Sequence, residues 1–163
     1  MKAFRIILTF LLVLGFTVQC SDDYLERTPP SSLTEDIFFN TVEDARATVN
    51  AAYAAIQLSP MYSEIYPKLA EVPSDDTPLN NTGGLSFDTF TWNAAAGELD
   101  AVYQSCYEGI FRCNLAIQKI PEIEIDQSLA DRLVGEAKFL RALYYWHLAA
   151  NFGEVPLVVE ADP

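Results

Sequence analysis

Three long stretches of the chain repeat apolar residues at helical spacing. The first starts at Thr41 and ends before Pro60, and its apolar positions recur every three or four residues. The second covers residues 98–120 and the third covers residues 127–152, again with one apolar stripe each. The pattern therefore predicts three long helices, each of which buries one face.

The predicted helix ends carry the residue types that helix ends prefer. Thr41 can cap the first helix, and Glu43 and Asp44 suit the positive end of its dipole. Asp126 can cap the third helix, and Gly153 fits the left-handed position that follows a helix. These local signals support the boundaries that the apolar pattern predicts.

The remaining segments are shorter or irregular. Residues 61–71 predict a short helix, and residues 155–159 predict an extended segment. Residues 73–97 are rich in Pro, Asn, Asp, Ser, Thr and Gly, with interspersed aromatic residues, and predict one long irregular loop. Loops of this length are usually functional or disordered. The whole pattern predicts an all-α fold of helical hairpins that resemble tetratricopeptide pairs.

The first twenty residues indicate an exported protein. Lys2 and Arg5 precede an uncharged apolar run at residues 6–16. A membrane-spanning helix needs about 20 apolar residues, so this shorter run predicts a secretory signal over residues 1–19.

Cys20 directly follows the apolar run and resembles the lipidated cysteine of a bacterial lipoprotein signal. Gln19 departs from the small residue usual before that cysteine, and ordinary cleavage nearby, which would leave a free thiol, is the alternative. We expect residues 20–31 to form a lipidated tether and residues 32–163 to form the helical domain.

Composition removes several classes of function. The formal net charge is −13, so nucleic-acid backbones and anionic membrane surfaces are poor partners. One histidine and three cysteines leave little for a zinc site, and we expect neither a metal nor a cofactor. Cys106 and Cys113 would lie about 10 Å apart on one helix, too far for a disulfide, so we expect both in the core.

Several strings along the chain resemble the SusD/RagB family, in the family's order. They are residues 20–36, Phe38-Phe39, Asp44-Ala45, residues 49–53, residues 103–110, Arg112-Cys113-Asn114, residues 135–145 and residues 151–157. The most specific is Gly135-Glu-Ala-Lys-Phe-Leu-Arg-Ala-Leu-Tyr-Tyr145.

The resemblance implies a surface-exposed outer-membrane lipoprotein of Bacteroidetes with a tetratricopeptide-like helical fold. Such proteins bind nutrients, often oligosaccharides, and cover a SusC-like TonB-dependent transporter; they are not enzymes. Family members run to several hundred residues, so we expect residues 32–163 to be an N-terminal portion that is incomplete at its C-terminus. The alternatives are a helical scaffold that docks to a partner without binding a ligand, or a truncated remnant without function.

A glycan site needs an aromatic face for the sugar's C–H surface and amides or carboxylates for its hydroxyls. The irregular loop offers Trp92 and Asn93, followed by Asp75 and Asp76, as candidate ligand-binding residues. The alternative is that Trp92 packs beneath the loop and that the acids cap turns. No partner base is visible for the two acids, so the sequence predicts no catalytic residue.

Other polar residues are expected to be structural. His147 continues the packing stripe of the third helix, and Asn114 is expected to be a buried hydrogen-bonding residue. Arg141 is expected to pair with Glu136 or Glu108.

Overall fold

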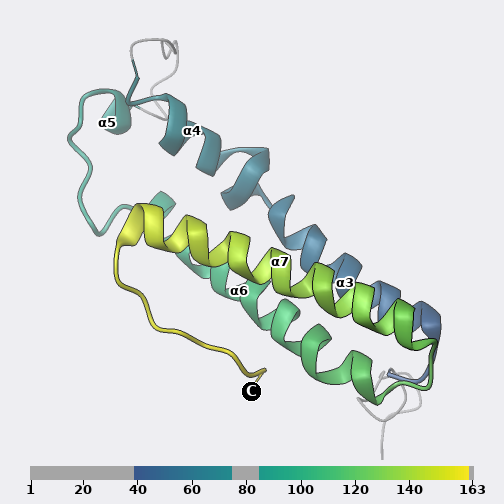
Figure 1. The fold of residues 1–163 in the computed structure, drawn as a ribbon. Helices are drawn as coiled ribbons and strands as arrows, with labels where there is room; N and C mark the ends of the chain where they lie inside the picture. The colour runs from purple at the N-terminus through teal and green to yellow at the C-terminus, as the bar shows by residue number, and fades with distance from the viewer. Residues whose placement is uncertain (1–38, 75–84, 162–163) are drawn as a thin grey trace, which may run out of the picture. The chain divides into compact units, whose positions relative to one another are not determined.

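The computed structural model describes residues 39–74 and 85–161, so the predicted signal and tether lie outside the described residues. Three long helices dominate this part of the chain: α3 (Val42–Ile56), α6 (Gly97–Lys119) and α7 (Gln127–Phe152) (Figure 1). Their bounds agree with the predicted helices within a few residues. The all-α prediction is confirmed.

Shorter elements link the long helices. They are the π-helical turn η2 (Ser59–Ser63), α4 (Ile65–Glu71), α5 (Leu85–Asp88) and the 3-10 turn η4 (Ile120–Glu122).

The helix predicted over residues 61–71 is interrupted. Glu64 separates η2 from α4 with φ −155° and ψ −63°. A helix that continued across this point would press the Pro67 ring against the Ser63 carbonyl, four residues before it. Because α4 begins only at Ile65, Pro67 falls in its first turn, where its missing N–H breaks no helical hydrogen bond.

The two predicted N-caps are confirmed in atomic detail. The Asp44 backbone N–H donates to Thr41 Oγ1 at 3.1 Å, and Asp44 Oδ2 accepts from the Thr41 backbone N–H at 2.9 Å. The side-chain bond to Thr41 also lowers the pKa of Asp44. Asp126 caps α7 by accepting from the Leu129 backbone N–H at 3.1 Å. Gly153 ends α7 with the expected positive φ of 76°. Its ψ of −126° lies outside the predicted left-handed helical region, in a conformation that glycine adopts far more readily than other residues.

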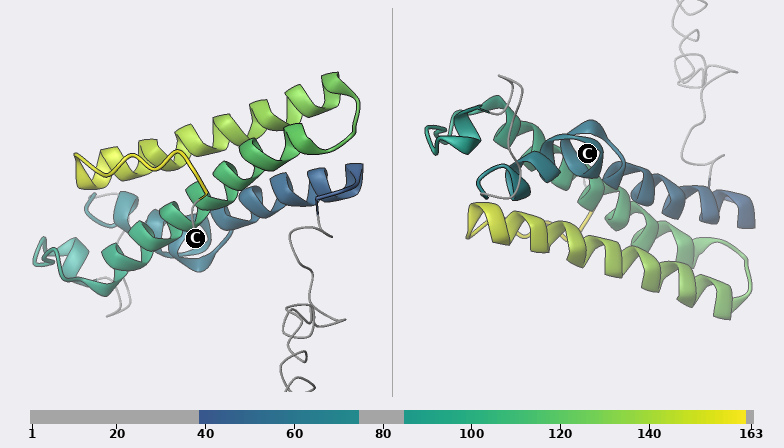
Figure 2. Two further views of the ribbon diagram at one scale, coloured as in Figure 1. Left: turned by 90° about the horizontal axis from the view of Figure 1, so that it is seen from below. Right: turned by 90° about the horizontal axis from the view of Figure 1, so that it is seen from above.

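The three long helices pack directly on one another. α6 contacts both α3 and α7, and α3 also contacts α7, and the helices lie side by side in both views of Figure 2. Cys106 and Cys113 are fully buried between them as free thiols, which confirms their predicted place in the core. Burial raises the pKa of the Cys106 thiol to about 12, so it stays protonated.

Residues 154–161 run extended beside α6 and α7 (Figure 1) and are held by side chains of both helices. Asn114 Nδ2 donates to the Val158 and Glu160 carbonyls at 3.1 Å each. Asn114 is 0% exposed, which confirms the expected buried hydrogen-bonding role. A buried side chain of α6 thus fixes the course of a segment that follows α7.

The expected ion pairing of Arg141 is wrong. Arg141 Nη1 donates to Asn114 Oδ1 at 2.8 Å and to the Val159 carbonyl at 3.4 Å. Glu136 pairs instead with Arg132, and Glu108 pairs with Arg112, each one helical turn away on the same helix. The Arg141 guanidinium of α7 thus bonds both to Asn114 of α6 and to the extended segment at Val159, and so helps to hold the segment in place.

Candidate functional site

A hollow of about 470 Å³ lies where four segments meet: α4, the loop before α6, the first turn of α6 and the last turn of α7. Its lining includes Leu69, Trp92, Asn93, Leu99, Asn151 and Phe152. Trp92 and Asn93, the leading candidates from the sequence, are thus brought together on one concave surface. Asp75 and Asp76 lie outside the described residues.

Trp92 is half-buried and belongs to a cluster of three aromatic rings. Its ring centroid lies 5.4 Å from that of Phe87, which is 1% exposed, and 5.4 Å from that of Phe90, which is 66% exposed. Phe90 has a positive φ of 54°, which is uncommon for a residue other than glycine. Trp92 therefore both packs under the loop, as the alternative proposed, and lines the hollow.

Asn93 is oriented by the turn that leads into α6. Its Oδ1 accepts from the Ala95 backbone N–H at 2.8 Å, and its backbone carbonyl accepts from the Ala96 N–H at 3.0 Å. An Asn side chain that bonds the backbone two residues ahead forms a typical Asx turn. One of the two lone pairs of Oδ1 is thereby used, and Nδ2 has no hydrogen-bond partner within the described residues.

Asn151 lines the same hollow and was not among the predicted site residues. Its Nδ2 donates to the His147 carbonyl at 2.7 Å, one turn back along α7. Its Oδ1 has no partner in the part of the chain that the structure describes. The sequence marked Asn151 only as an amide in the last turn of a helix that ends before Gly153. Amides are common at helix ends as capping residues, so this position did not indicate a binding site.

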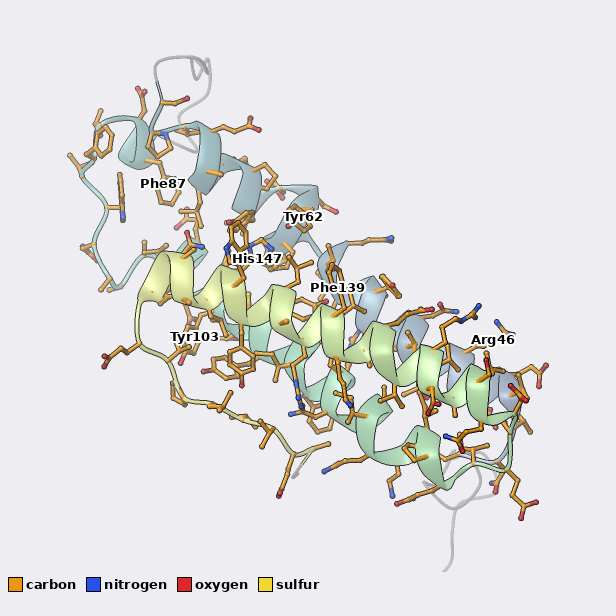
Figure 3. All side chains as sticks on the ribbon, in the orientation of Figure 1. Arg46, Tyr62, Phe87, Tyr103, Phe139 and His147 are labelled. Carbon is orange, nitrogen blue, oxygen red and sulfur yellow. The ribbon has the colours of Figure 1, made fainter. Side chains whose placement is uncertain are left out.

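An aromatic cluster of His147, Tyr62 and Tyr66 joins α7 to η2 and α4. His147 is 1% exposed, and its Nε2 is 2.8 Å from the Tyr62 hydroxyl (Figure 3). The Tyr66 ring packs edge-on against His147 at 4.4 Å between centroids. Burial lowers the pKa of His147 and raises that of Tyr62, so both stay neutral near pH 7. The expected core position of His147 is confirmed, although its buried Nδ1 has no hydrogen-bond partner in the described structure.

The lining of the hollow is uncharged across the described residues. Within the same residues, no group of three or more His, Cys, Asp or Glu side chains gathers as metal ligands would. None of the described helices combines the length and apolar character needed to cross a bilayer. The arrangement offers aromatic and aliphatic surface together with two side-chain amides, which is chemistry suited to binding.

The curated proteins that resemble this chain include two SusD-like proteins. The chain is 33% identical to SusD-like protein P38 and 28% identical to SusD-like protein P2, both of Formosa agariphila. These alignments cover 99% and 97% of this chain but only 32% and 31% of the relatives, so the chain spans about a third of their length.

A crystal structure of a SusD-like protein from Bacteroides fragilis has the same fold over 84% of this chain and 27% of its own, with a TM-score of 0.62 and 21% identity. Residues 23–163 match the family model SusD-like_3, which is described as starch-binding and associating with the outer membrane. On this match, which takes in all the described helices, the chain belongs to the SusD-like family.

Proposed function

We propose that this protein binds a nutrient, in the first instance an oligosaccharide, at the cell surface and passes it to a SusC-like TonB-dependent transporter. The observation that carries the proposal is the hollow that joins Trp92, Asn93 and Asn151. The half-buried indole offers a flat apolar face, and the amides offer hydrogen bonds, which together match the two kinds of surface of a sugar ring. Family membership supports the same role. The proposal is one of binding, without a catalytic step.

We expect Trp92→Ala to weaken oligosaccharide binding by roughly tenfold or more, because a tryptophan at the centre of a binding site commonly dominates its energy. Titration calorimetry of the full chain against a panel of oligosaccharides measures the effect. Trp146→Ala is the matched control, since this second tryptophan is 59% exposed on α7 and does not line the hollow.

Co-purification with the transporter separates binding from docking. Loss of oligosaccharide binding in Trp92→Ala with intact co-purification supports the proposal. If no oligosaccharide binds the unmodified protein while the transporter still co-purifies, the protein is a scaffold. Phe139 and Trp146, which are 68% and 59% exposed on α7, favour that second candidate because they offer an apolar surface to a partner. If the protein binds no oligosaccharide and does not co-purify with the transporter, it is the truncated remnant without function that the sequence analysis gave as an alternative.

The anchor proposed for this surface location is a lipid on Cys20, after removal of residues 1–19. This part of the proposal rests on the sequence, since these residues lie outside the described structure. Residues 20–31 would then be the tether between the lipid and the helical domain of residues 32–163. Several acyl chains would hold the protein firmly, because each buried CH₂ contributes about 0.8 kcal/mol.

We expect Cys20→Ser to move the protein from the membrane fraction to the soluble fraction, because serine lacks the thiol that accepts the lipid. Fractionation followed by immunoblotting measures the change. Ser21→Ala is the neighbouring control and is expected to leave the protein with the membranes. Equal fractionation of the Cys20 variant and the unmodified protein would show that Cys20 is not the anchor.

A further inference from the structure

One polar contact holds the η2–α4 segment to α7. Within the described residues, the 2.8 Å bond between the Tyr62 hydroxyl and His147 Nε2 is the only hydrogen bond between nitrogen or oxygen atoms that joins η2 or α4 to α6 or α7. The Tyr66 ring of α4 packs on the same imidazole, with 4.4 Å between centroids. α4 itself contains no fully buried residue and begins without a side-chain cap. Its attachment to α7 therefore depends on this imidazole.

The imidazole lies close to two walls of the hollow. Along α4, Leu69 follows Tyr66 by three residues and lines the hollow. Along α7, Asn151 follows His147 by four residues, lines the hollow and donates to the His147 carbonyl at 2.7 Å. Residues three or four apart share a helix face, so the contact between His147 and Tyr66 lies about one turn from the hollow on both helices. This contact thus fixes how the α4 wall meets the α7 wall.

The site of His147 accommodates a neutral imidazole and not an imidazolium. Either neutral tautomer can share a hydrogen bond with the Tyr62 hydroxyl, because a hydroxyl can donate or accept. The imidazolium carries an N–H on both ring nitrogens. Nδ1 is buried, and no group of the described residues accepts a bond from it. Protonation would thus place a charge and an unpaired N–H at a residue that is 1% exposed, which is costly.

The groups around His147 do not offset this cost. The titratable groups that face the cluster from the elements packed there are Tyr62 of η2, Tyr66 of α4 and Cys106 of α6. Burial is the cause that lowers the pKa of His147 from its ordinary value of 6.5. On α4, Glu64 and Lys68 pair with each other at 2.8 Å. The bond from Lys68 lowers the pKa of Glu64, so this carboxylate stays ionised in mild acid and does not produce a transition there.

We propose that His147 is a pH-dependent contact that closes one wall of the hollow: the neutral ring holds α4 against α7, and the imidazolium formed in mild acid releases α4 and widens the hollow. The buried residues Met61 and Val72, which flank α4, confine the release to this helix. The closed form binds fewer protons than the open form, so its stability is full above the ordinary pKa of histidine and is lost as the pH falls below it. This regulation goes beyond the proposed function and applies to any ligand of the hollow.

Hydrogen exchange of α4 in the full chain, corrected for the intrinsic exchange rate at each pH, measures the release. We expect α4 to open roughly three- to tenfold more often at about pH 5.5 than at about pH 7.5, since the opening constant rises by up to tenfold per pH unit below the ordinary pKa. His147→Gln keeps an amide for the Tyr62 hydroxyl but takes up no proton, so its α4 is expected to open equally often at both pH values.

Tyr62→Phe and Tyr66→Phe form a matched pair that tests the bond itself. Tyr62→Phe keeps the ring and removes the bond to His147, so we expect α4 to open more often already at about pH 7.5. Tyr66→Phe is the control, because the Tyr66 hydroxyl makes no hydrogen bond within the described residues. An NMR titration adds a direct readout, since the chain has one histidine and its ring resonances report His147 alone.

Opening of α4 that depends on pH in the unmodified protein but not in His147→Gln, with an NMR midpoint below the ordinary histidine value, supports the proposal. Equal opening at both pH values in the unmodified protein, or the same increase in His147→Gln, overturns it. Equal protection of α4 and α6 at about pH 7.5 also overturns it, because α4 would then open only with global unfolding. If His147→Gln does not fold, the tyrosine pair decides, and equal exchange in those two variants counts against the contact.

Discussion

Gly109→Ala is expected to destabilise the protein by about 2 kcal/mol or more, because the added methyl group would overlap the Tyr144 ring. A Cβ on Gly109 would lie well inside 3.0 Å of three Tyr144 ring atoms, closer than real Cβ atoms come. The ring has no room to retreat, since Tyr144 is 0% exposed and its hydroxyl donates to the Ala52 carbonyl at 2.7 Å. The absence of a side chain at Gly109 of α6 thus leaves room for Tyr144 of α7 to pass and bond to α3.

Thermal unfolding measures the effect, with an expected fall in Tm of roughly 6–10 °C. Gly135→Ala is the control, because a Cβ at Gly135 of α7 meets no atom within 4 Å. The same change there is expected to stabilise the protein by roughly 0.5–1 kcal/mol, since alanine is the better helix former. If both variants became more stable, the close contact between Gly109 and Tyr144 would be refuted.

Asn114→Ala is expected to lower the free energy of unfolding by roughly 2–4 kcal/mol and to release residues 154–161. The change removes two donated bonds to the Val158 and Glu160 carbonyls and the acceptor of Arg141 Nη1. Hydrogen exchange at the Val158 amide, which donates to the Tyr145 hydroxyl at 2.6 Å, reports the release directly. Faster exchange there than in the helices is the expected result.

Asn114→Asp separates the two roles of this side chain. The carboxylate keeps an acceptor for Arg141, but it has no N–H to donate to the extended segment. We therefore expect fast exchange at Val158 in this variant too. The loss of stability is expected to be at least as large, because a buried carboxylate oxygen would face the Val158 and Glu160 carbonyls. Gln118→Ala is the mild control, because within the described residues its side chain meets the segment through a single bond, accepted from the Ala161 N–H at 3.3 Å. Unchanged exchange in both Asn114 variants would mean that other contacts hold the segment.

The helices of this protein were predictable because their signals are local. Apolar spacing located α3, α6 and α7, and Thr41 and Asp126 marked two of their starts. The helix predicted over residues 61–71 was right for α4 but not for its start, because the chain breaks at Glu64 and so places Pro67 in the first turn of α4. Prediction failed for Arg141, because spacing along one helix does not show that a segment after the helix returns to meet it.

The candidate site was only partly predictable. Trp92 and Asn93 were identifiable because an aromatic residue and an amide stood together in a long irregular loop. Their proximity to Asn151 could not be predicted, because Asn151 lies on α7 and reaches the hollow only through helix packing. Asp75 and Asp76 stay predictions.

The sequence by itself determined the helical class of this protein, the ends of its long helices and its family, since these depend on periodicity, capping and residue strings that are read locally. Only the tertiary structure decided that the last turn of α7 closes a hollow against Trp92. It also decided which backbone groups bond and orient Asn93 and Asn151 there. The reason is physical: amide orientation depends on backbone groups in place around the side chain, and those groups are placed by packing between helices far apart in the chain.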